Sequence, residues 1–112
     1  MKFRLMRVKG ASMIPALRPG RLVIVDLRPR ALRLLGPDQV VAALLRDPES
    51  PGIIVKRIVA GPGGTHEAGG LRWQLGGNEF FLQGDGPGSR DSRAFGPVTR
   101  SEIVGRVRPL LF

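Results

Sequence analysis

Ile53-Ile-Val-Lys-Arg-Ile-Val-Ala60 carries the clearest strand signal in the chain, because β-branched residues fill most of the run. Successive side chains of a strand point to opposite faces, so Ile54, Lys56 and Ile58 share one face. Apolar residues occupy both faces, which is typical of a strand covered by protein on both sides. The pattern therefore places a lysine on a strand face that is otherwise aliphatic.

Short β-prone segments separated by Gly and Pro make up most of the remaining chain. We expect further strands over 2–8, 21–27, 39–45, 71–75, 80–83 and 105–112. The segments 71–75 and 80–83 flank a Gly-Gly-Asn turn and are expected to form a hairpin. Helix is expected only in short pieces, at 31–35 and at 101–104, the second capped by Ser101. The pattern predicts a mainly β fold, a compact coiled β-sheet or barrel with little helix.

The length of 112 residues fits one domain with a single hydrophobic core, and a hydrophobic content of 42% is typical of a globular protein. No cysteine is present, which excludes disulfides, a thiol nucleophile and thiolate metal ligands. The single histidine, His66, lies in the Gly-rich stretch 61–70, where we expect a solvated hairpin residue. We therefore expect neither a metal site nor a cofactor.

The longest uninterrupted apolar run, Val40 to Leu45, has six residues. A membrane-spanning helix needs about 20. No segment with the pattern of a secretory signal peptide precedes Ser12. We expect a soluble, cytoplasmic protein if this sequence is complete, and a membrane-associated, extracytoplasmic one if an anchor has been removed.

The net charge is +9, and fifteen of the eighteen basic residues are arginine. The arginines are spread over the whole sequence and are accompanied by only six aromatic residues. Phe80 and Phe81 are adjacent, so on a strand at most one of them can stack on a base. We therefore expect no nucleic-acid partner, and weak attraction to acidic partners or an anionic membrane surface accounts for the charge.

A second stretch, Val8-Lys-Gly-Ala-Ser-Met-Ile-Pro-Ala-Leu17, lies between two expected strands and contains strand-breaking Gly10 and Pro15. It offers the hydroxyl of Ser12 from a loop whose neighbouring residues are apolar, although an ordinary turn has the same composition. Lys56 also has two interpretations. It either extends to the rim of the sheet or is buried and deprotonated, which an arginine could not be.

A third stretch runs from Gly84 to Gly96 and begins with three glycines and a proline in five positions. Such a composition occurs in phosphate-binding loops, but no Gly-Lys-Ser/Thr follows and no helix is expected behind it. We instead expect an ordered loop from Gly84 to Pro97 with internal polar pairing, chiefly between Asp91 and Arg93.

The three stretches occur in the order and spacing of the signature motifs of the type I signal peptidase family, and the chain resembles that family from Val8 to Val107. The motifs are Gly-x-Ser-Met-x-Pro-x-Leu at 10–17, Val-Lys-Arg-Ile-Val-x-x-Pro-Gly at 55–63, and Gly-Asp…Ser-x-Asp-Ser-Arg-x-Phe-Gly at 84–96. In size and in its Gly-rich loop the chain is similar to short, anchorless members that mature nickel-type superoxide dismutase.

The resemblance implies a fold of the signal peptidase–LexA catalytic-core type over residues 1–112, with no large inserted domain and no transmembrane anchor. It also implies a serine endopeptidase that removes a leader or propeptide by cutting an extended precursor segment after small residues.

By the same resemblance, Ser12 corresponds to the nucleophile, Lys56 to its general base and Ser89 to the serine that orients the lysine. Asp91 and Arg93 correspond to an ion pair beside the site. A serine hydroxyl needs such a base, and burial among aliphatic side chains is the means available to keep a lysine neutral.

The oxyanion and substrate region is expected around Gly10, Ala11 and Met13, with the Ser12 backbone N–H as one donor. Many family members have a hydroxyl where this chain has Gly10, which leaves the second donor open. The loop after Gly84 is one residue shorter than the family's usual version.

Two other interpretations stay open. One is a LexA-like self-cleaving domain, although only eleven residues precede Ser12 and these are too few for a cleavage segment. The other is a non-catalytic basic β-barrel binding module, which would be indifferent to loss of the Ser12 hydroxyl. The oligomeric state is not predicted.

Overall fold

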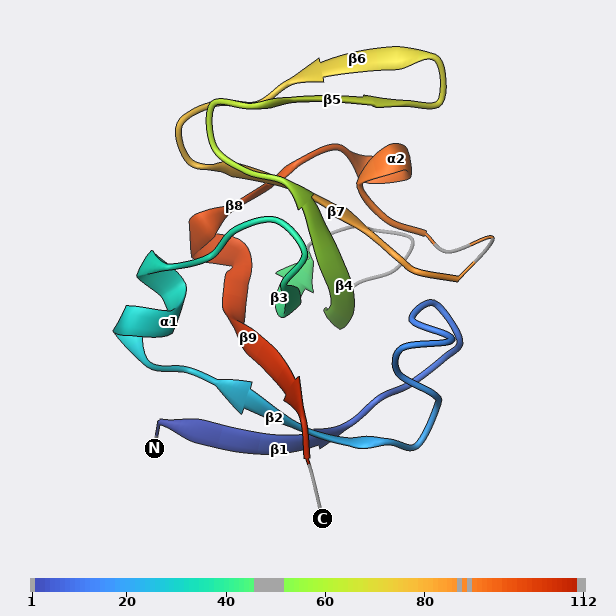
Figure 1. Ribbon diagram of the computed structural model, residues 1–112, viewed down its shortest axis with the longest axis vertical. Helices are drawn as coiled ribbons and strands as arrows, with labels where there is room; N and C mark the ends of the chain where they lie inside the picture. The colour runs from blue at the N-terminus through green and yellow to red at the C-terminus, as the bar shows by residue number, and fades with distance from the viewer. Residues whose placement is uncertain (1, 46–51, 87, 89, 111–112) are drawn as a thin grey trace.

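The computed structural model describes residues 2–45, 52–86, 88 and 90–110, and it is mainly β with short helices (Figure 1). The strands are β1 (Phe3–Arg7), β2 (Leu22–Asp26), β3 (Val40–Leu45), β4 (Gly52–Ala60), β5 (Thr65–Ala68), β6 (Leu71–Gln74), β7 (Glu79–Gln83), β8 (Val98–Thr99) and β9 (Ile103–Pro109). The helices are α1 (Pro29–Arg33), α2 (Ser92–Phe95) and the 3₁₀ turn η1 (Arg100–Glu102).

Seven strands form one antiparallel sheet in the order β1-β2-β9-β3-β4-β7-β8, and β5 pairs with β6 in a separate hairpin. The hairpin lies at one end of the molecule, and β1 and β2 lie at the other (Figure 1). In the described residues no pairing joins β1 to β8, so the sheet is open and the barrel alternative is wrong. Strand β9 connects the two halves of the sheet by pairing with β2 on one side and with β3 on the other.

Apolar clusters lie on both faces of the middle strands. Val41 and Ala43 of β3 belong to one cluster with Ile58, whereas Ala42 belongs to the other with Val25. Adjacent residues of a strand point to opposite faces, so β3 contributes to both clusters. Two-sided burial was predicted for β4, where it is only partial. Lys56 and Ile58 are buried on one face, whereas on the other face Ile53 is 52% exposed and Val55 and Val59 are half-buried.

Several local predictions are wrong because the pairings join distant segments. The expected hairpin of 71–75 with 80–83 does not form, since β6 pairs with β5, and β7 pairs with β4 and β8. His66 lies on a hairpin as predicted, in β5, but it is half-buried rather than solvated, with its ring 4.7 Å from that of Phe81.

The loop from Gly84 to Pro97 contains a short helix, α2, that was not expected. The predicted cap at Ser101 is also displaced. Thr99 precedes η1, and its backbone N–H donates to the Glu102 carboxylate at 2.9 Å. The strand predicted over 2–8 forms as β1, and its Phe3 and Leu5 are exposed. Within the described residues no helix is long and apolar enough to span a membrane.

Candidate active site

The loop of residues 8–20, which joins β1 to β2, is held in place at both its neck and its centre. The Gly20 N–H donates to the Val8 carbonyl at 2.8 Å and closes the neck. Met13 and Leu17 are 1% and 4% exposed and pack into the cluster on the inner face of β2. Ser12 precedes Met13, so a core side chain anchors the serine's backbone. The Met13 side chain thus belongs to the core, whereas the sequence placed it in the substrate region.

Ser12 is half-buried, and the two residues before it are exposed. Gly10 has a φ of 74°, in the left-handed region that favours glycine. In the described part of the chain, no backbone hydrogen bond takes up the Ser12 N–H. This donor is therefore available to a ligand.

Lys56 is 5% exposed and lies opposite Val41 in the pairing of β3 with β4. Burial lowers the pKa of its amine below the ordinary value for lysine. The charge of Asp91 acts in the opposite direction, and that of Arg93 lowers the pKa further. No hydrogen bond or ion pair holds the amine within the described residues. Between the two interpretations of this lysine, the structure favours the buried one.

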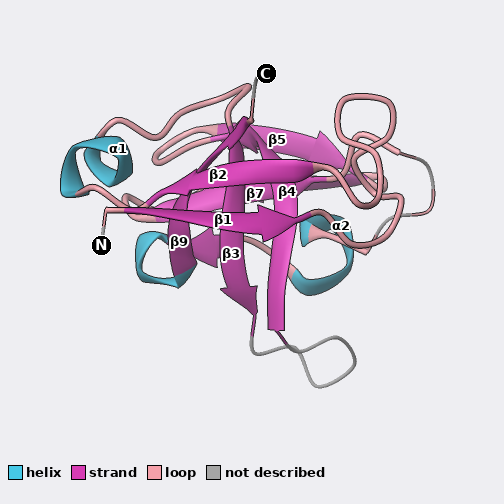
Figure 2. Ribbon diagram, turned by 90° about the horizontal axis from the view of Figure 1, so that it is seen from below, coloured by secondary structure: helices cyan, strands magenta, loops and turns pink. Residues whose placement is uncertain are grey.

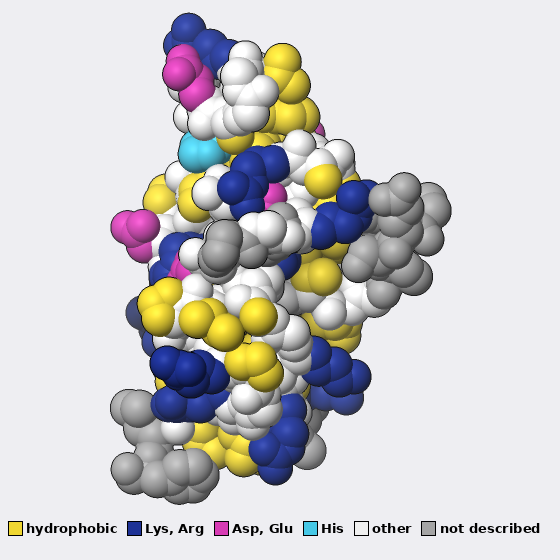
Figure 3. All heavy atoms as spheres, turned by 90° about the vertical axis from the view of Figure 1, so that its right-hand side faces the viewer, with side chains coloured by type: hydrophobic (Ala, Val, Ile, Leu, Met, Phe, Trp, Pro, Cys, Tyr) yellow, Lys and Arg dark blue, Asp and Glu magenta, His cyan; other side chains and the backbone are white. Residues whose placement is uncertain are grey.

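Ser12 and Lys56 line the same cleft, which has a volume of about 520 Å³. Its other lining residues are Met6, Arg7, Lys9, Ile53, Ile54 and Val55. One wall is therefore the end of β1 and the following loop, and the other is the first half of β4. Figure 3 views the molecule from the side on which this loop lies, where hydrophobic side chains lie beside Lys and Arg side chains.

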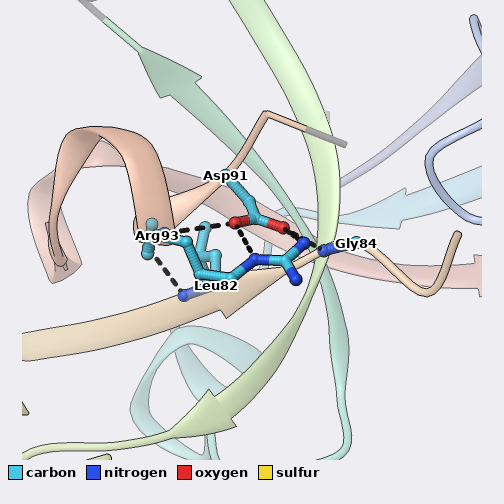
Figure 4. Close-up of polar contacts among 5 residues, drawn as sticks. Leu82, Gly84, Asp91 and Arg93 are labelled. Atoms are coloured by element: carbon cyan, nitrogen blue, oxygen red, sulfur yellow. Dashed lines mark hydrogen bonds and ion pairs between the residues drawn. The ribbon is translucent and has the colours of Figure 1, made fainter. Parts of the chain in front are cut away.

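Asp91 and Arg93 form the predicted ion pair (Figure 4). Two parallel hydrogen bonds join them: Arg93 Nε donates to Asp91 Oδ1 at 2.9 Å and Nη2 donates to Oδ2 at 2.7 Å. The Gly84 N–H also donates to Asp91 Oδ2, at 2.9 Å. Burial raises the pKa of the Asp91 carboxyl, but these hydrogen bonds outweigh it and hold that pKa below its usual range.

Ser89 lies outside the described residues, so its expected contact with Lys56 stays a prediction. The neighbouring Ser92 is fully buried, and its Oγ accepts a hydrogen bond from the Leu82 N–H at 2.8 Å (Figure 4). Ser92 therefore fixes α2 against β7 and has a structural role.

Gly86 connects two of the three motifs. Its N–H donates to the Ser12 carbonyl at 2.7 Å. A Cβ at position 86 would lie 2.7 Å from the Ala11 carbonyl oxygen, closer than real contacts allow. Hydrophobic periodicity in the sequence does not indicate such a close backbone contact, which is seen only in the folded structure.

Arg57 and Asp85 form a second paired contact that the sequence did not indicate. Arg57 Nε and Nη2 donate to the two carboxylate oxygens of Asp85 at 2.9 and 2.7 Å, and Nη1 donates to the Asp38 carbonyl at 2.7 Å. The contact attaches the loop after β7 to β4, next to Lys56. In the sequence, only the opposite charges of Arg57 and Asp85 indicate this pair, and many other pairs of residues have opposite charges.

In the part of the chain that the structure describes, no three His, Cys, Asp or Glu side chains gather as metal ligands. The site therefore consists of a hydroxyl, a buried amine, a free backbone N–H and a neighbouring ion pair. Comparisons of the chain with protein-family models and with curated proteins find no match.

Proposed function

We propose that this protein is a serine endopeptidase of the signal peptidase type, with Ser12 as the nucleophile and Lys56 as the general base. The observation that carries the proposal is the shared cleft, because residues 44 positions apart line one cavity and one of them is a lysine with a lowered pKa. A serine attacks an amide only when an adjacent base takes its proton.

In the proposed reaction the neutral Lys56 amine accepts the Ser12 hydroxyl proton as Oγ bonds to the substrate carbonyl carbon. The Ser12 N–H donates to the oxyanion that forms. Lys56 then transfers the proton to the leaving amine, the C–N bond breaks, and an acyl-enzyme remains. Water hydrolyses the acyl-enzyme with Lys56 again as base, which restores the Ser12 hydroxyl and releases the new carboxyl terminus.

The Asp91–Arg93 pair supports this chemistry by its nearly balanced charge. A single carboxylate near Lys56 would favour the protonated amine, whereas Arg93 opposes that effect. Ser89, by the family resemblance, would orient the amine.

The substrate is proposed to be an extended segment of a precursor protein. Among the described residues, β4 pairs with β7 only from Arg57 onward, so residues 52–56 have a strand neighbour on one side alone. A peptide that enters the cleft can pair with this free edge as an added strand. The aliphatic side chains of Ile53, Ile54 and Val55 favour small apolar residues near the cut.

The test is cleavage of a complex peptide library, with products identified by mass spectrometry. Wild-type protein should cut after small residues, and Ser12→Ala and Lys56→Met should each abolish the cuts. Lys9→Met is the matched control, because Lys9 also lines the cleft but is exposed. Cuts that persist in Ser12→Ala, or that occur after charged residues, would contradict the proposal. Wild-type protein that cuts no library peptide and only its own chain would favour the LexA-like alternative.

A further inference from the structure

Among the described residues, helix α1 packs against β9, but no element covers the outer face of β1 and the adjoining part of β2. Val23, Val25 and Val107 point inward and are buried, so the alternate residues of these strands point outward. Leu5 is 64% exposed and Phe3 42%. They line an open apolar groove of about 550 Å³ with Arg4 and Ile24. Figure 2 looks directly onto β1 and β2.

A strongly basic pocket adjoins this face, at the junction of β2, β9 and α1. It has a volume of about 270 Å³ and is lined by Asp26, Arg28, Arg30, Ala31, Leu34, Gln39, Arg106 and Arg108. We call it the arginine pocket. The sheet register makes it continuous with the apolar groove, because Ile24 pairs with both Leu5 and Arg108.

The single acidic residue of the arginine pocket is already paired. Asp26 is fully buried, and Arg28 donates to its two carboxylate oxygens at 3.0 and 2.9 Å. Within the described residues, Arg30, Arg106 and Arg108 form no ion pair or hydrogen bond with a carboxylate. Among the described residues, these three guanidinium groups therefore have no hydrogen-bonded counter-charge in the pocket, although the charge of Asp26 also acts on Arg108.

We propose that the arginine pocket binds the phosphate headgroup of an anionic phospholipid while Phe3, Leu5 and Ile24 contact the acyl-chain boundary of the bilayer. Guanidinium groups bind phosphate oxygens in a bidentate manner, and their weak hydration suits an interface. A bilayer surface presents anionic phosphate beside hydrocarbon, which matches the arrangement of the pocket and the groove. This inference does not depend on the proposed peptidase activity.

Other occupants fit the face less well. A nucleic acid would require stacking surfaces, but Leu5 and Ile24 are aliphatic, and the Arg28 guanidinium covers one face of Phe3 at 4.9 Å from the ring centroid. A second copy of this chain would bring the like charges of two arginine pockets together. The phospholipid supplies both the negative charge and the apolar surface.

The test is co-sedimentation with vesicles of phosphatidylglycerol and phosphatidylcholine, at several salt concentrations. The double variant Arg106→Gln/Arg108→Gln should bind these vesicles about 10- to 30-fold more weakly than wild type. The matched control, Arg18→Gln/Arg72→Gln, removes the same charge from two exposed arginines outside the pocket and should bind nearly as wild type. Leu5→Asn should weaken vesicle binding without a change in charge.

An equal loss of vesicle binding in the two double variants would contradict the proposed role of the arginine pocket, because net charge alone would then explain binding. Absence of wild-type binding to the mixed vesicles, or equal binding to pure phosphatidylcholine, would overturn it too. Inorganic phosphate and a single-stranded RNA serve as competitors. If either competitor binds more tightly than the vesicles, the assignment of a lipid ligand is rejected. The Ser12→Ala variant should bind vesicles as wild type does, because the pocket is separate from the proposed peptidase site.

Discussion

At the scale of single residues, Lys56 is the unusual one. Burial of an amine that forms no ion pair with any described residue costs folding free energy that a hydrocarbon side chain would not cost. The same burial lowers the pKa, which is the property that a lysine base requires. Stability and activity should therefore respond in opposite directions when this side chain is replaced.

Two substitutions separate these effects. Lys56→Met keeps the side-chain length and removes the amine, so cleavage should be lost while the melting temperature stays equal or rises. Lys56→Arg should also lose cleavage, and it should melt lower because a permanent charge enters the same site. Thermal melts with cleavage assays measure both. An arginine variant that melts and cuts like wild type would remove Lys56 from the mechanism.

The pH dependence of stability gives an independent check on Lys56. Its folded pKa is lowered from 10.5, so the unfolded chain binds the proton more tightly. The destabilising effect is complete below the folded pKa and disappears as the pH rises toward the unfolded value. The free energy of unfolding of wild type should therefore approach that of Lys56→Met with increasing pH, as denaturant titrations would show. A constant difference between the two proteins would mean an unperturbed lysine.

Arg93 should influence the same pKa from outside the cleft. Its charge lowers the pKa of Lys56 and its hydrogen bonds hold Asp91, so Arg93→Gln should raise the apparent pKa for cleavage. The acidic limb of the pH–rate profile should then move to higher pH. Arg93→Lys keeps the charge and should move it less. If Arg93→Gln lowers the maximal rate without moving the acidic limb of the pH–rate profile, Arg93 has a structural role alone.

At the scale of elements, the site depends on contacts between loops that belong to different strands. The 8–20 loop follows β1, and the loop after β7 carries Gly86, Asp91 and Arg93. Gly86 connects the two loops through the Ser12 carbonyl, and Arg57 attaches the second loop to β4. The relative position of nucleophile and base is therefore set by these loops as well as by the sheet.

Gly86→Ala tests this coupling. The added methyl group would collide with the Ala11 carbonyl and displace the serine loop, which should lower turnover by about 100-fold. Gly77→Ala is the control, because a Cβ at that position meets no atom within 4 Å. Turnover of Gly86→Ala equal to that of Gly77→Ala would show that the contact does not position Ser12.

At the scale of the whole molecule, sequence patterns indicate strands more reliably than strand partners. Local composition leaves Lys56 open between the rim of the sheet and a buried position, whereas the strands over 53–60 and 39–45 follow from it. The register does not: alternation in Phe3 and Leu5 looks the same whether that face is buried or exposed, and nothing local shows that β9 lies between β2 and β3. The Gly86 contact and the Arg57–Asp85 pair arise only from folding.

The unequal burial of the two sheets predicts unequal local stability. Every residue described for β3 except Val40 and Leu44 is buried, whereas none of those in β5 and β6 is. Amide hydrogen exchange should therefore be slowest in β3 and fastest, among strands, in the β5–β6 hairpin. Mass spectrometry of exchanged peptides measures this order. Equal protection in both would mean that the hairpin opens only with the whole domain.

The position of β9 has a consequence for when the protein can act during its synthesis. Ser12 belongs to the β1–β2 half of the sheet and Lys56 to the β3–β4–β7 half, and the strand that connects the halves follows both in the sequence. A nascent chain that has not yet released residues 103–109 from the ribosome carries the hydroxyl and the amine on halves that no strand pairing joins. The proposed peptidase would thus become active only after β9 has left the ribosome and completed the sheet.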